Sequence, residues 1–223
     1  SEFQKPMKLT KGKWSPSKII KNREVLLLAS GPRANDYKQE IERYIESKKP
    51  FVIALNTEIN INKNFIDVYA ACNPLKLIAD SDLYQSLSSP LVVPESLLSD
   101  NLKRKFKKLK LLDFAVGLKE NYFEFHKTGA VMPKLFTLAY ALSIATSGNA
   151  SKILLAGFDG YGPKDRRTKI VDELMGLDVM FLLIKLSSLS SIYVDKWLLT
   201  IMSNESILFC KRSLFIILFS LST

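Results

Sequence analysis

The chain has 223 residues, enough for one large domain or for one domain with an appendage. Apolar residues make up 47% of it, which allows a sizeable core and excludes intrinsic disorder as the default state. The formal net charge of +10 indicates an attraction to anions, whether nucleotides, sugar nucleotides, nucleic acids or acidic lipid surfaces.

The two cysteines bear on the cellular setting. Cys72 and Cys210 lie far apart, and the sequence holds no Cys-x-x-Cys pair and no Cys/His cluster. We therefore expect no metal site and no disulfide framework, and a reducing, cytoplasmic setting. We also expect no secretory signal and no transmembrane segment, because no apolar run approaches the roughly 20 residues that a membrane helix needs.

The positive charge gathers in two clusters. One lies in residues 1–23, which we interpret as a tag remnant followed by a basic leader. The other, residues 103–110, holds six cations around Phe106. A solvated helix face is the ordinary interpretation of such a run, and an anion-binding surface for nucleic acid or lipid is the alternative. The single aromatic residue weakens the nucleic-acid interpretation, because aromatic side chains supply base stacking.

Short apolar runs closed by turn residues predict buried parallel strands. The first run, residues 24–29, ends at a Ser-Gly-Pro turn, and a helix capped by Asp36 is predicted to follow it through residue 48. The same patterns predict further strands at 51–55, 65–71, 91–94, 109–116 and 152–157, and a helix at 133–147.

The alternation of short strands with helices predicts an α/β fold. We expect a Rossmann-like, mostly parallel sheet with helices on both faces, formed by residues 24–175. Residues 176–223 form an apolar tail rich in Ser and Leu. Two interpretations of this tail stay open: it completes the core, or it no longer serves the original fold.

In such sheets, ligands bind beyond the carboxyl ends of the strands. A glycine after the first strand lets the backbone approach a phosphate, and Asn side chains after later strands can pair with a base edge or a hydroxyl. A Thr-Gly pair expected just before the helix at 133–147 is a further candidate, and ordinary turn chemistry is the alternative for each residue. The candidate ligand-binding residues are Ser30, Gly31, Pro32, Asn56, Asn73, Thr128, Gly129 and Gly157.

Three residues are candidates for chemistry. Asp159 follows a buried strand, where a carboxylate can act as a base, hold a ribose hydroxyl or simply close a turn. Tyr161 adds a second polar group to the same loop. His126 is the only histidine, so it is a candidate general base, with a structural role as the alternative.

Two stretches, 25–32 with 53–56 and 127–129 with 152–161, carry these motifs in a particular order. They resemble a Rossmann-like domain at the C-terminal end of aldolase-like proteins of the hydroxymethylglutaryl-CoA lyase type, encoded with bacterial surface-polysaccharide genes. More distantly, they are similar to bacterial sialyltransferases that use CMP-sialic acid. The sialyltransferases place a catalytic His after the Gly-x-Asp-x-Tyr strand, where this chain has none.

The resemblance implies a cytidine-type nucleotide or nucleotide sugar beside Ser30, Gly31, Asn56, Thr128, Gly129, Gly157 and Asp159. A glycosyltransferase-like domain of surface-polysaccharide biosynthesis is the first functional expectation, with Asp159 or His126 as base and Tyr161 stabilising the leaving phosphate. The alternative is a non-catalytic domain of an aldolase or lyase, working beside its barrel in oligomerisation, for instance as a homodimer, or in substrate hand-off.

Overall fold

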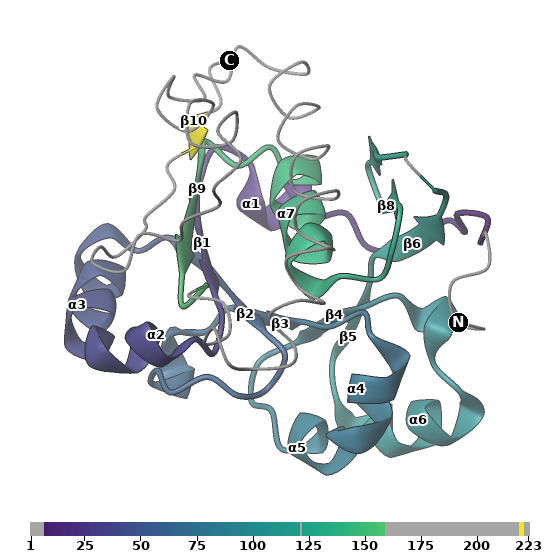
Figure 1. The fold of residues 1–223 in the computed structure, drawn as a ribbon, viewed down its shortest axis with the longest axis horizontal. Helices are drawn as coiled ribbons and strands as arrows, with labels where there is room; N and C mark the ends of the chain where they lie inside the picture. Colours follow the sequence, from purple (N-terminus) through teal and green to yellow (C-terminus); the bar gives the residue numbers. More distant parts are fainter. Residues whose placement is uncertain (1–6, 121, 159–218, 221–223) are drawn as a thin grey trace, which may run out of the picture.

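The structure is a computed structural model that describes residues 7–120, 122–158 and 219–220 (Figure 1). Its main sheet has the strand order β10-β9-β1-β2-β3-β4-β5, and all strands except β10 run parallel. The strands are β1 (Glu24–Leu28), β2 (Phe51–Leu55), β3 (Val68–Ala70), β4 (Leu91–Val93), β5 (Leu111–Asp113), β9 (Lys152–Ala156) and β10 (Phe219–Ser220). The predicted α/β, Rossmann-like fold with a mostly parallel sheet is confirmed.

Helices cover both faces of this sheet. They are α1 (Ser17–Ile20), α2 (Pro32–Asp36), α3 (Lys38–Lys48), α4 (Pro74–Ala79), α5 (Ser81–Gln85), α6 (Asp100–Lys105) and α7 (Thr137–Ser147). Three 3-10 turns accompany them: η2 (Lys63–Phe65), η3 (Glu95–Leu97) and η4 (Phe106–Lys108).

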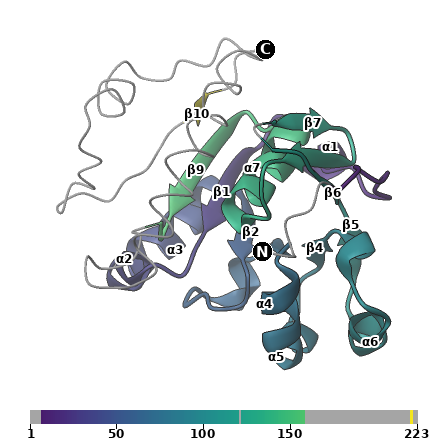
Figure 2. The same ribbon diagram turned by 45° about the vertical axis from the view of Figure 1, so that its right-hand side comes forward.

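The main sheet has a hydrophobic core on each face, because successive side chains of a strand point to opposite faces. In β1, Val25 and Leu27 join the core that contains α7, whereas Leu26 and Leu28 join the core that contains residues of α3, α4, α5 and α6. The strands are therefore apolar on both faces, which is why their sequences are continuous apolar runs rather than alternating ones. Figure 2 shows α7 and the group of α4, α5 and α6 on opposite sides of the sheet.

A second, three-stranded sheet packs against α7. It consists of β6 (Ala115–Leu118), β7 (Glu124–His126) and β8 (Gly129–Met132), with β8 parallel to β6 and antiparallel to β7. The prediction of one strand over residues 109–116 was therefore wrong. The chain leaves the main sheet at Phe114, whose buried ring packs edge-on against Trp14 and Tyr140, and a new strand begins in the other sheet.

A buried hydrogen bond joins α7 to this junction. The Tyr140 hydroxyl donates to the Phe114 carbonyl at 2.6 Å, and both residues are fully buried. We expect Tyr140→Phe to lower the free energy of unfolding by about 1–3 kcal/mol, because the carbonyl loses its partner in a dry site. Urea unfolding measures this, with Tyr37→Phe at a 40% exposed position as the control. Equal stabilities for the two variants would contradict the assignment.

Several element boundaries differ from those predicted. Asp36 is the last residue of α2 and not the cap of one long helix, because the chain turns at Tyr37 before α3 begins. The helix predicted from residue 133 begins at Thr137. The third strand begins only at Val68, since the carboxylate of Asp67 accepts a hydrogen bond from the backbone of Val52 and the chain before it forms a 3-10 turn.

Part of the segment interpreted as a basic leader is built into the fold. Met7 pairs with Leu118 of β6, and the Trp14 backbone N–H donates to the Asp113 carbonyl at 3.0 Å. Ile20 of α1 is fully buried in the core that contains α7. From Met7 onward, the basic residues of this segment are therefore carried on a chain that packs against both sheets.

Candidate functional site

The topology singles out one point at the carboxyl edge of the main sheet. β1 and β9 are neighbours, but the chain leaves β1 toward α2 and α3 on one face and reaches β9 from α7 on the other. The strand order therefore reverses between β1 and β9, and in open α/β sheets ligands bind outside the carboxyl ends of the strands at such a point. The loops that follow β1 and β9 therefore flank the candidate site.

These two loops are held together by backbone hydrogen bonds. Ala29 donates to the Ala156 carbonyl and Gly31 to the Gly157 carbonyl, each at 2.9 Å. Gly157 has a φ of +78°, and a Cβ on it would lie 2.2 Å from the Ala29 carbonyl oxygen. The sequence places Gly31 and Gly157 far apart, and the structure brings them together as expected from a shared sheet edge.

This pairing changes the role of the first loop. The Gly31 N–H is already used by Gly157, so it is bound within the protein rather than directed to a phosphate. Ser30 beside it is exposed, and Pro32 is the first residue of α2. A ligand at this loop would meet the Ser30 side chain before it met the Gly31 amide.

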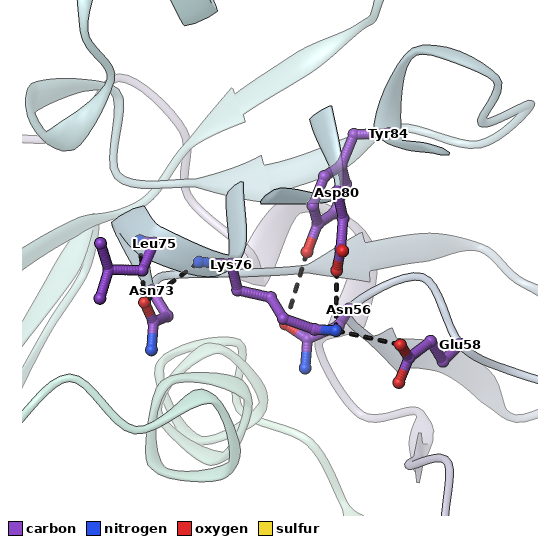
Figure 3. A network of polar contacts seen from close by, with 7 residues as sticks. All are labelled: Asn56, Glu58, Asn73, Leu75, Lys76, Asp80 and Tyr84. Carbon is purple, nitrogen blue, oxygen red and sulfur yellow. Dashed lines mark hydrogen bonds and ion pairs between the residues drawn. The ribbon is translucent and has the colours of Figure 1, made fainter. Parts of the chain in front are cut away.

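Asn56 lies at the end of β2, next along the sheet. Its backbone is in the left-handed region with φ at 59°, and its N–H donates to the Ala70 carbonyl of β3 at 3.0 Å. Its side-chain oxygen accepts from the Tyr84 hydroxyl at 3.4 Å. Burial raises the pKa of Tyr84, which keeps the hydroxyl protonated as a donor. The amide nitrogen of Asn56, turned away from Tyr84 in Figure 3, is left as a donor for a ligand.

Asn73 follows β3 and has a structural task. Its side-chain oxygen accepts from the backbone N–H groups of Leu75 at 3.0 Å and Lys76 at 3.3 Å, which makes it the N-cap of α4. Pro74 occupies the first helical position, where its missing N–H costs nothing. The turn interpretation of Asn73 therefore holds for its oxygen, whereas its amide nitrogen is not needed for the cap.

A charged cluster that the sequence did not reveal lies beside Asn56. The Lys76 ammonium of α4 is 3.1 Å from a Glu58 carboxylate oxygen and 2.7 Å from an Asp80 carboxylate oxygen (Figure 3). Burial lowers the pKa of Lys76, but its contacts with Asp80 and Glu58 more than offset this and raise it overall. The Lys76–Glu58 pair ties the loop after β2 to α4, whereas the Lys76–Asp80 pair lies within α4 and its C-cap. Only the i,i+4 spacing of Lys76 and Asp80 could have signalled part of this cluster.

The start of α7 also reaches this edge. Thr137 is the first residue of α7, and Cys72, just beyond β3, is fully buried in the core that contains α7. Burial raises the pKa of the Cys72 thiol to about 12, so it stays protonated and unreactive near neutral pH. No side chain caps the first turn of α7 at Phe136. Thr137 was not singled out by the sequence, because neither a Gly-rich loop nor a capping residue precedes it.

Thr128 and Gly129 lie elsewhere. Thr128 lies in the turn between β7 and β8, and Gly129 is the first residue of β8, so the pair does not lead into a helix and the prediction for it is corrected. The Thr128 carbonyl accepts from the Ala115 N–H at 2.9 Å, and Gly129 pairs with Ala115 and His126 within the small sheet. Their described contacts tie them to β6 and β7 and not to the loops after β1 and β9.

The candidate catalytic residues divide between two regions. His126 ends β7, and its Nε2 lies 3.4 Å from a Glu124 carboxylate oxygen; both side chains are partly exposed. Asp159 and Tyr161 lie outside the described residues. His126 thus belongs to the small sheet, whereas Asp159 follows Gly157 by two residues in the sequence.

The described residues contain neither a metal-ligand cluster nor a membrane-spanning helix. Over 7–120, 122–158 and 219–220, no three His, Cys, Asp or Glu residues gather as metal ligands would. In that same part of the chain, no helix is both long and apolar enough to cross a membrane. Neither a protein-family model nor a curated protein matches the sequence.

Proposed function

We propose that this protein binds a nucleotide or nucleotide sugar at the carboxyl edge of the main sheet, as a glycosyltransferase-like domain does. The observation that carries the proposal is the reversal of strand order between β1 and β9, with Gly31 and Gly157 hydrogen-bonded across it. Such a reversal is the ordinary place for a nucleotide in open α/β folds. The motif resemblance to transferases that use CMP-sialic acid supports a cytidine nucleotide.

Three groups on neighbouring elements suit the parts of such a ligand. The uncapped first turn of α7 offers backbone N–H groups and the positive end of a helix dipole to a phosphate. Asn56 offers an amide donor to an acceptor atom of the base or sugar. The exposed Ser30 hydroxyl stands at the loop after β1 and can donate to or accept from a hydroxyl or phosphate.

A transfer reaction would draw on the loop after β9. In an inverting transfer, the acceptor hydroxyl oxygen forms a bond to the anomeric carbon while the bond from that carbon to the phosphate oxygen breaks, and the hydroxyl proton passes to a base. We propose Asp159 as that base, because it follows Gly157 by two residues. Tyr161 would donate to the departing phosphate. The position of His126 in the small sheet favours Asp159 over it.

Calorimetric titration with CMP, CDP, UDP and AMP tests the binding step. We expect saturable binding of a cytidine nucleotide, and about tenfold weaker binding in Asn56→Asp. This change keeps the size of the side chain and its acceptor for Tyr84 but replaces the amide donor by an anion, so the ligand loses a hydrogen bond. Aspartate also tolerates the left-handed backbone at this position.

The matched control is Asn101→Asp, the same change at an exposed position of α6. It should bind as the unaltered protein does, and thermal unfolding should show that both variants are folded. If no nucleotide binds, the proposal fails, and the accessory-domain expectation takes its place. If the two variants weaken binding equally, the effect is one of net charge and Asn56 is not in the site.

A further inference from the structure

A surface formed by α4, α5, α6 and η4 combines positive charge with exposed apolar side chains. The cationic strip consists of Lys103, Arg104, Lys105, Lys107, Lys108 and Lys110. It lies on α6 and η4 and continues to the start of β5, and every one of these side chains is exposed. Asp100 is the only acidic residue between positions 100 and 110.

Most of this charge has no acidic partner among the described residues. Among the described residues, Lys103 pairs loosely with Asp100 at 3.8 Å and Lys105 pairs with Asp82 at 2.9 Å. The other four cations, Arg104, Lys107, Lys108 and Lys110, have no ion-pair partner in that part of the chain. A concentrated positive field therefore faces solvent.

The strip is presented on a rigid base. Leu102 and Phe106, which are 4% and 1% exposed, point into the core, and the Phe106 ring packs edge-on against Tyr84 with centroids 6.0 Å apart. Because these residues anchor the segment, their charged neighbours are directed outward. The same burial removes the one aromatic ring of the strip from any contact with a nucleic-acid base.

An apolar cluster adjoins the strip. It consists of Leu75 and Ile78 of α4 and Leu83 of α5, which are 58%, 56% and 51% exposed. They are the three most exposed large hydrophobic residues in the described part of the chain. Leu75 and Ile78 are three positions apart on one helix, so they share a face.

A specific contact joins the two surfaces. The Lys105 ammonium of α6 donates to the Ser81 hydroxyl at 2.8 Å and to the Asp82 carboxylate at 2.9 Å, directly before Leu83. α5 also contacts both α4 and α6. Figures 1 and 2 both place α4, α5 and α6 together in the lower part of the molecule, away from α1.

We propose that this surface, the cationic strip with the apolar cluster, docks the protein on a membrane that contains anionic phospholipid. The cations attract the headgroups, and each one adds to the attraction near such a surface. The leucine and isoleucine side chains enter the boundary between headgroups and acyl chains, where burying them is favourable. A nucleic acid would use the charge but would gain nothing from exposed aliphatic side chains.

The test is flotation of the full chain with vesicles of phosphatidylcholine, either alone or mixed with phosphatidylglycerol. We expect binding only to the mixed vesicles, and weaker binding as salt rises. The double variant Lys107→Glu/Lys108→Glu should bind about tenfold more weakly or not at all, because it removes two attractions and adds two repulsions. The double variant Ile78→Ser/Leu83→Ser should also bind more weakly, at unchanged net charge.

The matched control places the same kinds of change on α1 and the turn that follows it. Lys18→Glu/Lys21→Glu alters two exposed cations and Ile19→Ser alters a 40% exposed aliphatic residue, and both variants should float as the unaltered protein does. Circular dichroism melting confirms that all variants are folded.

Four outcomes would overturn the proposal: no vesicle binding, equal binding to neutral vesicles, loss of binding in the α1 controls, or full binding by Ile78→Ser/Leu83→Ser. A parallel titration with a fluorescent single-stranded oligonucleotide tests whether the partner is a nucleic acid rather than a membrane. The strip serves a nucleic acid instead if three results coincide: the oligonucleotide binds, the variant Lys107→Glu/Lys108→Glu loses this binding, and vesicles do not bind.

Discussion

The Gly157→Ala variant is expected to lose about 2–5 kcal/mol of its free energy of unfolding. Two costs add up here. The backbone φ of +78° disfavours any residue with a Cβ, at about 1–2 kcal/mol, and the new methyl group would lie 2.2 Å from the Ala29 carbonyl oxygen. Relief of that contact requires the loops after β1 and β9 to separate, which costs about 1–3 kcal/mol more. Urea unfolding monitored by circular dichroism measures the loss.

Asn149→Ala separates the two costs. Asn149 also has a positive φ, of 55°, but its side chain is exposed at the end of α7. This variant should therefore show the backbone cost alone, about 1 kcal/mol. If Gly157→Ala were no more destabilising than Asn149→Ala, the close approach of the two loops would be contradicted. Nucleotide binding by the Gly157→Ala variant should fall together with its stability, since the loops after β1 and β9 flank the proposed site.

Gly12→Ala is expected to be destabilising to a similar extent, by about 3 kcal/mol. A Cβ at Gly12 would lie 2.2 Å from the Thr128 carbonyl oxygen, 2.6 Å from the Asp113 carbonyl oxygen and 2.8 Å from the Ala115 nitrogen. All three are backbone atoms at the junction of the two sheets, so no side-chain rotation can relieve the overlap. Urea unfolding again provides the measurement.

Lys11→Ala is the control for this prediction. Lys11 is the exposed neighbour of Gly12, and replacing it should change the free energy of unfolding by no more than about 0.5 kcal/mol. A tolerant Gly12 would mean that residues 7–16 do not pack at the junction. A large loss of stability would instead show that this basic segment is part of the folded unit.

The strands of the main sheet were predictable because their consecutive residues are apolar and buried. A strand that is covered on both faces needs an apolar side chain at every position, and residues 25–28 and 51–55 meet this need. The turn residues after them then placed Gly31, Asn56, Asn73 and Gly157 at the ends of strands that lie in one sheet.

The elements that were predicted wrongly depend on contacts between distant residues. The segment 109–116 was predicted as one strand, and it divides because Phe114 is buried against Trp14 and Tyr140. The Thr128–Gly129 pair was expected just before a helix as a ligand-binding candidate, but Gly129 begins β8, which pairs with β6. Strand pairing of this kind has no local signature when the strands are three or four residues long.

The sequence by itself determined the class of fold and the edge of the sheet at which polar loops gather, because local apolar runs and turn residues encode both. Only the tertiary structure decided how those loops are used. It commits the Gly31 amide to Gly157 and the Asn56 oxygen to Tyr84, and it pairs Lys76 with Glu58. Hydrogen bonds and ion pairs between residues far apart in the chain depend on their positions in space, which no local pattern records.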